Sequence, residues 1–134
     1  MNKSDKVVLV VEDNAANMRF CHALLNSRGY IVLQATYGVQ GLRMAREHRP
    51  DLILMDIQLP DISGLEVTKR LKEDKTLKSI PVIAVTVFTL NSEEERCLAA
   101  GCDGFISKPI SIPDLMQTVE HLLDRPVAQA LAIR

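Results

Sequence analysis

The chain has 134 residues, 47% of them hydrophobic and 25% charged, which is enough for one domain with a buried core. A formal net charge of −1 and an aromatic content of 4% give neither a basic surface nor many rings for stacking on bases, so we expect no nucleic-acid binding. The apolar runs are too short to cross a bilayer and the N-terminus does not resemble a signal peptide, so we expect a cytoplasmic chain without membrane contact.

The cysteines, Cys21, Cys97 and Cys102, are odd in number and lack the spacing of a metal site. We therefore expect reduced thiols that act as small apolar residues, as is usual in a cytosolic protein.

Short β-branched runs alternate along the chain with longer segments of helical periodicity, a pattern typical of a parallel sheet covered by helices on both faces. The strands are expected at residues 6–11, 30–35, 51–55, 81–86 and 103–107. The helices are expected at 15–28, 38–48, 64–74, 91–100 and from about 111 to 123.

Local signals set the ends of these elements. Gly29 and Gly101 suit the residue after a helix, and Pro50 cannot continue one. The acidic run "EEER" suits a helix N-terminus and is expected to form a solvated face. We expect a single domain at residues 1–124 and a disordered tail at 125–134, where the helical register is lost.

Polar residues stand at the ends of four of the expected strands. Glu12 and Asp13 follow the first, Asp56 ends the apolar run of the third, Thr86 ends the fourth, and Lys108 follows the fifth. In doubly wound sheets, ligands bind beyond the carboxyl ends of the strands. We therefore expect these residues to converge on one pocket.

Three carboxylates in one pocket repel each other unless a cation joins them, and hard oxygen ligands favour Mg²⁺. Asp13 and Asp56 are candidates for direct ligands, the backbone carbonyl of Gln58 for a further one, and Glu12 for a ligand through water.

A carboxylate can attack phosphorus to form an aspartyl phosphate, and Asp56 is the candidate nucleophile. Lys108 would neutralise charge on the phosphoryl oxygens, and the Thr86 hydroxyl would donate to one of them. A cis Lys108–Pro109 peptide bond is expected to hold the lysine inward.

From Lys6 to Leu123, the motifs "VVEDN", "LILMDIQLPDISGLEV", "IAVT" and "GFISKP" resemble the receiver domains of two-component response regulators in order and spacing. The resemblance implies a flavodoxin-like α/β fold, a parallel sheet of strand order 2-1-3-4-5 with five helices, and Thr86 and Phe105 as switch residues, Phe105 being the switch aromatic. Among receiver domains, these motifs are most similar to the sequences of single-domain, DivK-type regulators of cell division and polarity.

The resemblance further implies phosphorylation by a histidine kinase or a phosphotransfer protein. No effector domain is expected after residue 124, so output is expected through protein contacts made by the fourth helix, fifth strand and fifth helix. We expect self-catalysed phosphotransfer and autodephosphorylation, and no turnover of external substrates.

Alternatives remain open from the residues alone. Mg²⁺-dependent phosphatases of the haloacid dehalogenase type also use a strand-end aspartate, but in the motif Asp-x-Asp. Here Gln58 stands at the position of the second aspartate, which would be the general acid. A flavodoxin-like phosphate-binding carrier would need a loop unlike the acidic "EDNAAN". An adaptor that is never phosphorylated remains possible, as does a purely packing role for Phe105 or a strand-end role for Thr86.

Val87 departs from the receiver pattern, which has a small residue such as alanine or glycine after the hydroxyl residue. A β-branched residue that overhangs the pocket would slow entry of both a phosphodonor and water. The alternative is that Val87 packs into the sheet.

Overall fold

Five parallel strands form one sheet, in the order β2-β1-β3-β4-β5 that was predicted. The computed structural model describes residues 6–87 and 91–123, so the expected tail at 125–134 lies outside the described residues. The strands are β1 (Val7–Val11), β2 (Ile31–Ala35), β3 (Leu52–Asp56), β4 (Val82–Thr86) and β5 (Gly104–Ser107).

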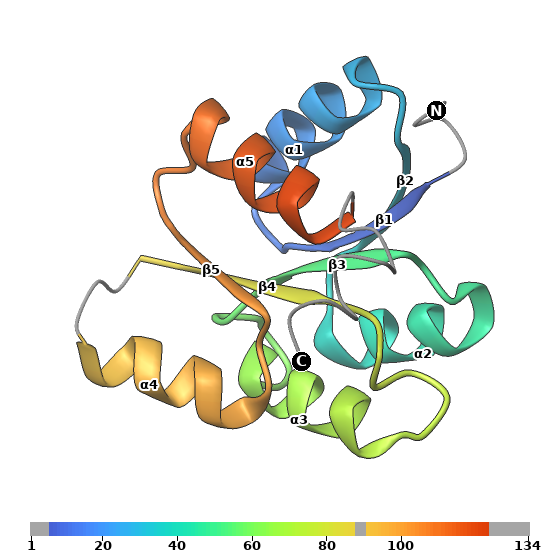
Figure 1. Cartoon of the computed structure of the whole chain (residues 1–134), viewed down its shortest axis with the longest axis vertical. Coiled ribbons are helices and arrows are strands. Elements are labelled where there is room, and N and C mark those ends of the chain that lie inside the picture. The colour runs from blue at the N-terminus through green and yellow to red at the C-terminus, as the bar shows by residue number, and fades with distance from the viewer. Residues whose placement is uncertain (1–5, 88–90, 124–134) are drawn as a thin grey trace, which may run out of the picture.

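Helices cover both faces of the sheet, with α1 and α5 on one face and α2, α3 and α4 on the other (Figure 1). Their bounds are α1 (Ala15–Ser27), α2 (Gly38–His48), α3 (Gly64–Glu73), α4 (Asn91–Ala100) and α5 (Ile112–Leu123). Among the described helices, none combines the length and the apolarity that crossing a membrane requires.

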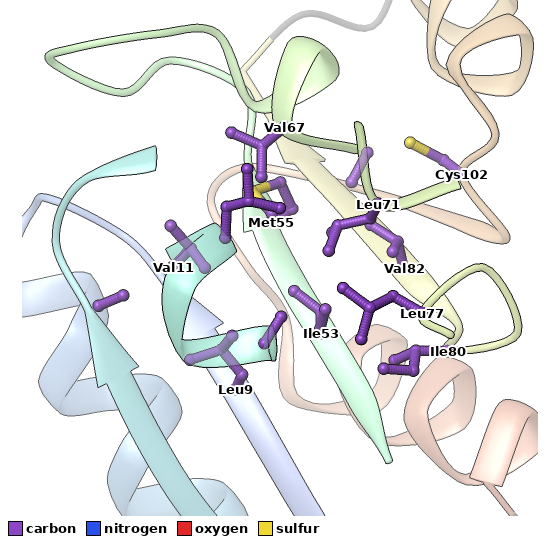
Figure 2. Close-up of a cluster of buried hydrophobic side chains, with 14 of the residues drawn as sticks. Leu9, Val11, Ile53, Met55, Val67, Leu71, Leu77, Ile80, Val82 and Cys102 are labelled. Carbon is purple, nitrogen blue, oxygen red and sulfur yellow. The ribbon is translucent and has the colours of Figure 1, made fainter. Parts of the chain in front are cut away.

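Alternation along the central strands divides the core into two layers. Leu9, Val11, Ile53 and Met55 pack under α2 and α3, as Figure 2 shows, while the intervening residues face α1 and α5. Every residue of β3 is buried because helices lie on both sides of it. A strand buried on both faces is rigidly held, and this one ends in Asp56.

The register of the sheet aligns the strand ends. Val11 lies beside Met55, and Asp56 lies beside Val85, so the residues after β1, β3 and β4 reach the same edge. Parallel strands all point their carboxyl ends to this edge, which is where the predicted polar residues come together.

Two helix ends differ from the predicted ones by one residue. Ser27 is the last residue of α1 because Arg28 leaves the helical conformation as its cap, and Asp74 likewise caps α3. Gly29 and Gly101 follow helices with φ of 92° and 104°, as expected for residues without a Cβ.

The expectation of a fully solvated "EEER" face was wrong at Glu93, which is only 7% exposed. Its carboxylate accepts a hydrogen bond from Arg96 at 3.2 Å, while Glu94 and Glu95 are exposed as predicted. Periodicity could not identify this position, because a glutamate paired with an arginine can be buried where an unpaired one cannot.

Candidate functional site

The carboxylates of Glu12, Asp13 and Asp56 lie together at the carboxyl edge of the sheet, each with an oxygen within 4.8 Å of the others. Glu12 and Asp56 are each 3% exposed, whereas Asp13 is exposed to solvent. The sequence prediction that these acids converge is confirmed.

Lys108 reaches the two buried carboxylates from the segment after β5. Its Nζ lies 3.2 Å from Asp56 Oδ2 and 3.3 Å from Glu12 Oε1. Its backbone N–H donates to the Thr86 carbonyl at 2.7 Å, and the Lys108–Pro109 peptide bond is cis. The ammonium group is therefore held against the buried carboxylates by its own backbone as well as by charge.

Burial raises the pKa of the Glu12 carboxyl, and the charge of Asp56 raises it further. Burial lowers the pKa of Lys108, but the charges of Asp56 and Glu12 outweigh it, so the net pKa lies above its ordinary value. Lys108 is thus firmly charged at neutral pH. The negative charge on Glu12 is therefore disfavoured by its surroundings.

The cluster forms the floor of an open pocket of about 700 Å³. Its lining comprises Glu12, Asp13, Asn14, Ala15, Asn17, Asp56, Gln58, Leu59, Pro60, Val87 and Lys108. Sequence reasoning did not single out Asn14 or Asn17. The only local signal for these two residues was their place at the start of α1. Asn14 is the N-cap residue, and its side chain accepts a hydrogen bond from the Asn17 N–H.

Val87 lines this pocket and is 51% exposed, so the alternative in which it packs into the sheet was wrong. The residue lies just past the end of β4, the strand that ends at Thr86.

The loop after β3 is built tightly around Asp56. Gln58 N–H donates to Asp56 Oδ1 at 3.2 Å, and Gly64 N–H donates to the Ile57 carbonyl at 2.8 Å. A Cβ on Gly64 would collide with the backbone carbonyl of Asp56, so this close approach requires glycine. The Gln58 backbone therefore stays next to the carboxylates.

Thr86 and Phe105 belong to neighbouring strands. Thr86 is 1% exposed at the end of β4, and Phe105 is half-buried on β5 beside Ala84. Phe105 packs against the core layer under α2, α3 and α4. Val87 lines the pocket, but Thr86, which was expected there as well, is not among the described residues that line it. Phe105 pairs with Ala84, two residues before Thr86.

The donor set fits a hard divalent cation. Three carboxylates face one ammonium group, which leaves excess negative charge at an open pocket. Mg²⁺ prefers oxygen ligands, and this set contains neither cysteine nor histidine. Because Asp13 is exposed, water has room to bind in the coordination shell of the ion.

Fold and site together define a class: a doubly wound, flavodoxin-like α/β domain with an acidic pocket and a lysine at the carboxyl edge. The family model of the response regulator receiver domain matches residues 8–120. The chain belongs to the response regulator receiver domain family.

Its curated relatives include the polar-differentiation response regulator DivK of Brucella anthropi, 52% identical over 118 residues, which cover 88% of this chain and 96% of that protein. DivK of Brucella ovis is similar to the same degree, again 52% over 118 residues with 88% and 96% coverage. The likeness to DivK-type regulators seen in the sequence motifs is confirmed.

Solved structures agree in fold. The receiver domain of a sensor histidine kinase from Pseudomonas aeruginosa, with a magnesium ion coordinated in its active-site cleft, is 33% identical with a TM-score of 0.83 and covers 89% of this chain and 98% of that one. A CheY-like receiver domain protein from Methanospirillum hungatei is 29% identical with a TM-score of 0.82, covering 89% and 94%.

Proposed function

We propose that this chain is a phosphorylation-dependent signalling switch that accepts a phosphoryl group on Asp56. The observation that carries the proposal is the contact of Lys108 Nζ with Asp56 and Glu12, at 3.2 and 3.3 Å, at the floor of an open acidic pocket. A buried strand end holds the nucleophile, and the pocket leaves it open to a donor.

In the proposed step, an Asp56 carboxylate oxygen forms a bond to phosphorus while the bond from phosphorus to the donor breaks, and the donor departs with that bonding pair. The Lys108 ammonium, now shared by two carboxylates, is placed to stabilise negative charge on the phosphoryl oxygens. Nothing in the Asp56 side chain needs to lose a proton, because it reacts as a carboxylate.

Glu12, Asp13, Asp56 and the Gln58 carbonyl would hold Mg²⁺, which when bound neutralises charge on the carboxylates and on the incoming phosphoryl group. The buried Glu12 accepts from the Asn14 N–H at 3.1 Å and from Lys108, which suits a role through water more than direct binding. Asp13, being exposed, is free to turn toward the ion.

Thr86 and Phe105 are the proposed link to the protein surface. The Thr86 hydroxyl would donate to a phosphoryl oxygen, and movement of Thr86 would change the packing of the half-buried Phe105 on the next strand. The surface formed by α4, β5 and α5 would then shift between two arrangements and bind partners differently.

The proposed donor is a histidine kinase or a phosphotransfer protein, and the proposed effectors are proteins that bind the α4–β5–α5 surface. By similarity to the DivK regulators, we place this switch in the control of cell division or polarity. A cytoplasmic location suits buried cysteines that are all free thiols.

A phosphatase acting on external substrates is less well supported, because the residue two positions after Asp56 is the exposed amide Gln58 and cannot serve as a general acid. The stronger competitor is an adaptor of receiver fold that is never phosphorylated. The two differ in one measurable property, which is whether Asp56 takes up phosphate.

The test is the intact mass of the chain after incubation with acetyl phosphate and Mg²⁺, compared with Asp56→Asn treated in the same way. The proposal predicts one added phosphoryl group on the natural chain, none on the variant, and none on either when a chelator is in excess. A chain that remains unmodified with Mg²⁺ present would support the adaptor instead.

A further inference from the structure

The N-terminus of α2 is capped by a side chain from a distant part of the sequence. Its N-cap residue, Tyr37, makes no side-chain cap hydrogen bond. Instead, Gly38 N–H donates to Asp61 Oδ1 at 2.7 Å and Val39 N–H donates to Asp61 Oδ2 at 2.9 Å. Both carboxylate oxygens of Asp61 therefore satisfy amides at the positive end of the helix.

The two segments are also closely packed. A Cβ on Gly38 would lie 2.8 Å from Ile62, 3.0 Å from Val67 and 3.3 Å from Asp61 Oδ1, so only glycine lets them approach this far. These amides hold the pKa of the exposed Asp61 carboxyl below its ordinary value. The carboxylate and the glycine are thus matched parts of one junction.

This junction bears on the pocket because Asp61 belongs to the loop between β3 and α3. The two ends of that loop are joined by the Gly64 N–H bond to the Ile57 carbonyl at 2.8 Å. The Asp61 bonds fasten its outer part to α2, an element that contributes no lining residue to the pocket. Gln58, whose N–H donates to Asp56 Oδ1 and whose carbonyl is a proposed ion ligand, lies between Ile57 and Asp61 in the chain.

We infer that Asp61 is a positioning residue, which ties the β3–α3 loop to α2 and thereby holds the Gln58 backbone in place beside Asp56. The role in ion binding rests on the proposed function. The tether itself is a property of the protein without metal.

A merely structural residue would act through the stability of α2 alone, and the sequence allows the two roles to be separated. Tyr37 has an extended backbone, with φ of −128° and ψ of 153°, and is 53% exposed. An aspartate there can cap α2 locally. The double variant Tyr37→Asp with Asp61→Asn therefore keeps the net charge and a capped helix but lacks the tether.

Two measurements are made on the full chain: Mg²⁺ affinity by calorimetry, and amide hydrogen exchange at Gln58 and in α2 without metal. Asp61→Asn should weaken Mg²⁺ binding by about fivefold to tenfold, somewhat below the effect of residues that bond directly to a metal ligand. Exchange at Gln58 should become several-fold faster. Adding Tyr37→Asp should restore protection of α2 and leave both other effects unchanged.

The matched control is Glu66→Gln, which removes one exposed carboxylate at the start of α3, where it pairs only with Arg70 at 3.1 Å among the interactions described for it. Equal effects in this control, or recovery of the Gln58 exchange rate in the double variant, would overturn the inference. The exchange data test whether Asp61 tethers the loop even if the natural chain binds no Mg²⁺. Failure of the natural chain to bind Mg²⁺ would count against the proposed function and not against the tether.

Discussion

Replacing Lys108 with alanine removes the cation shared by two buried carboxylates. Lys108 Nζ lies 3.2 Å from Asp56 Oδ2 and 3.3 Å from Glu12 Oε1, and its side chain is 16% exposed. At an effective dielectric constant of about 20, each contact is worth roughly 5 kcal/mol of attraction. Desolvation of the ammonium and the carboxylates offsets much of this sum.

The loss in Lys108→Ala should be smaller than the 3–5 kcal/mol or so that follows when a fully buried pair is broken, because the pocket admits water. We expect about 1–3 kcal/mol of unfolding free energy without metal, which corresponds to roughly 4 °C of Tm for each kcal/mol. Mg²⁺ should recover most of the loss, because it supplies the missing positive charge to the same carboxylates.

The assay is thermal unfolding with and without Mg²⁺, with Lys69→Ala as the control for an exposed lysine on α3. Lys108→Ala should also fail to change its α4–β5–α5 surface after treatment with acetyl phosphate. A variant that is unfolded at room temperature, or one that Mg²⁺ does not stabilise, would refute the reasoning and make Lys108 a structural counter-ion.

Three further predictions concern the switch, the pocket entrance and the acids. Phosphorylation should alter amide exchange most between residues 91 and 123, and a change confined to α2 and α3 would contradict the proposed coupling through Thr86 and Phe105. Val87→Ala should speed both labelling by acetyl phosphate and dephosphorylation several-fold, on the order of 1 kcal/mol of barrier, while unchanged rates would leave Val87 without a gating role. Folding raises the pKa of Glu12 from 4.5, so the folded state binds this proton more tightly than the unfolded state does. Without metal, the free energy of unfolding should therefore fall as the pH rises from about 4.5 through the raised pKa. Glu12→Gln should flatten that slope in urea titrations across this pH range, and an unchanged slope would show that the charge on Glu12 costs the fold nothing.

The sequence predicts the parts of this molecule that depend on local order. Apolar runs ending in acids identify β1 and β3, and the parallel arrangement then requires Glu12 and Asp56 to meet at one edge. The ends of α1 and α4 follow from Gly29 and Gly101, which act within a few residues of the helices. Strand order and the proposed switch role of Phe105 came from resemblance to receiver domains, which periodicity alone could not supply.

Contacts between distant segments could not be predicted. Asp61 caps a helix 22 residues earlier in the chain, and Lys72 Nζ bonds to Asp103 Oδ2 at 2.9 Å across 31 residues. The burial of Glu93 likewise depends on how α4 packs against its neighbours. The acidic residues that follow Glu93 would by themselves indicate an exposed helix face. Each depends on tertiary packing, which local patterns do not encode.

The central claim is that Asp56 is the phospho-acceptor, and mapping the modified residue tests it most directly. The natural chain is labelled with acetyl phosphate and Mg²⁺, digested, and analysed by tandem mass spectrometry under conditions that preserve acyl phosphates. We expect one phosphoryl group, on the Asp56 side chain. A phosphoryl group on Asp13, Glu12 or any other residue, with Asp56 unmodified, would contradict it.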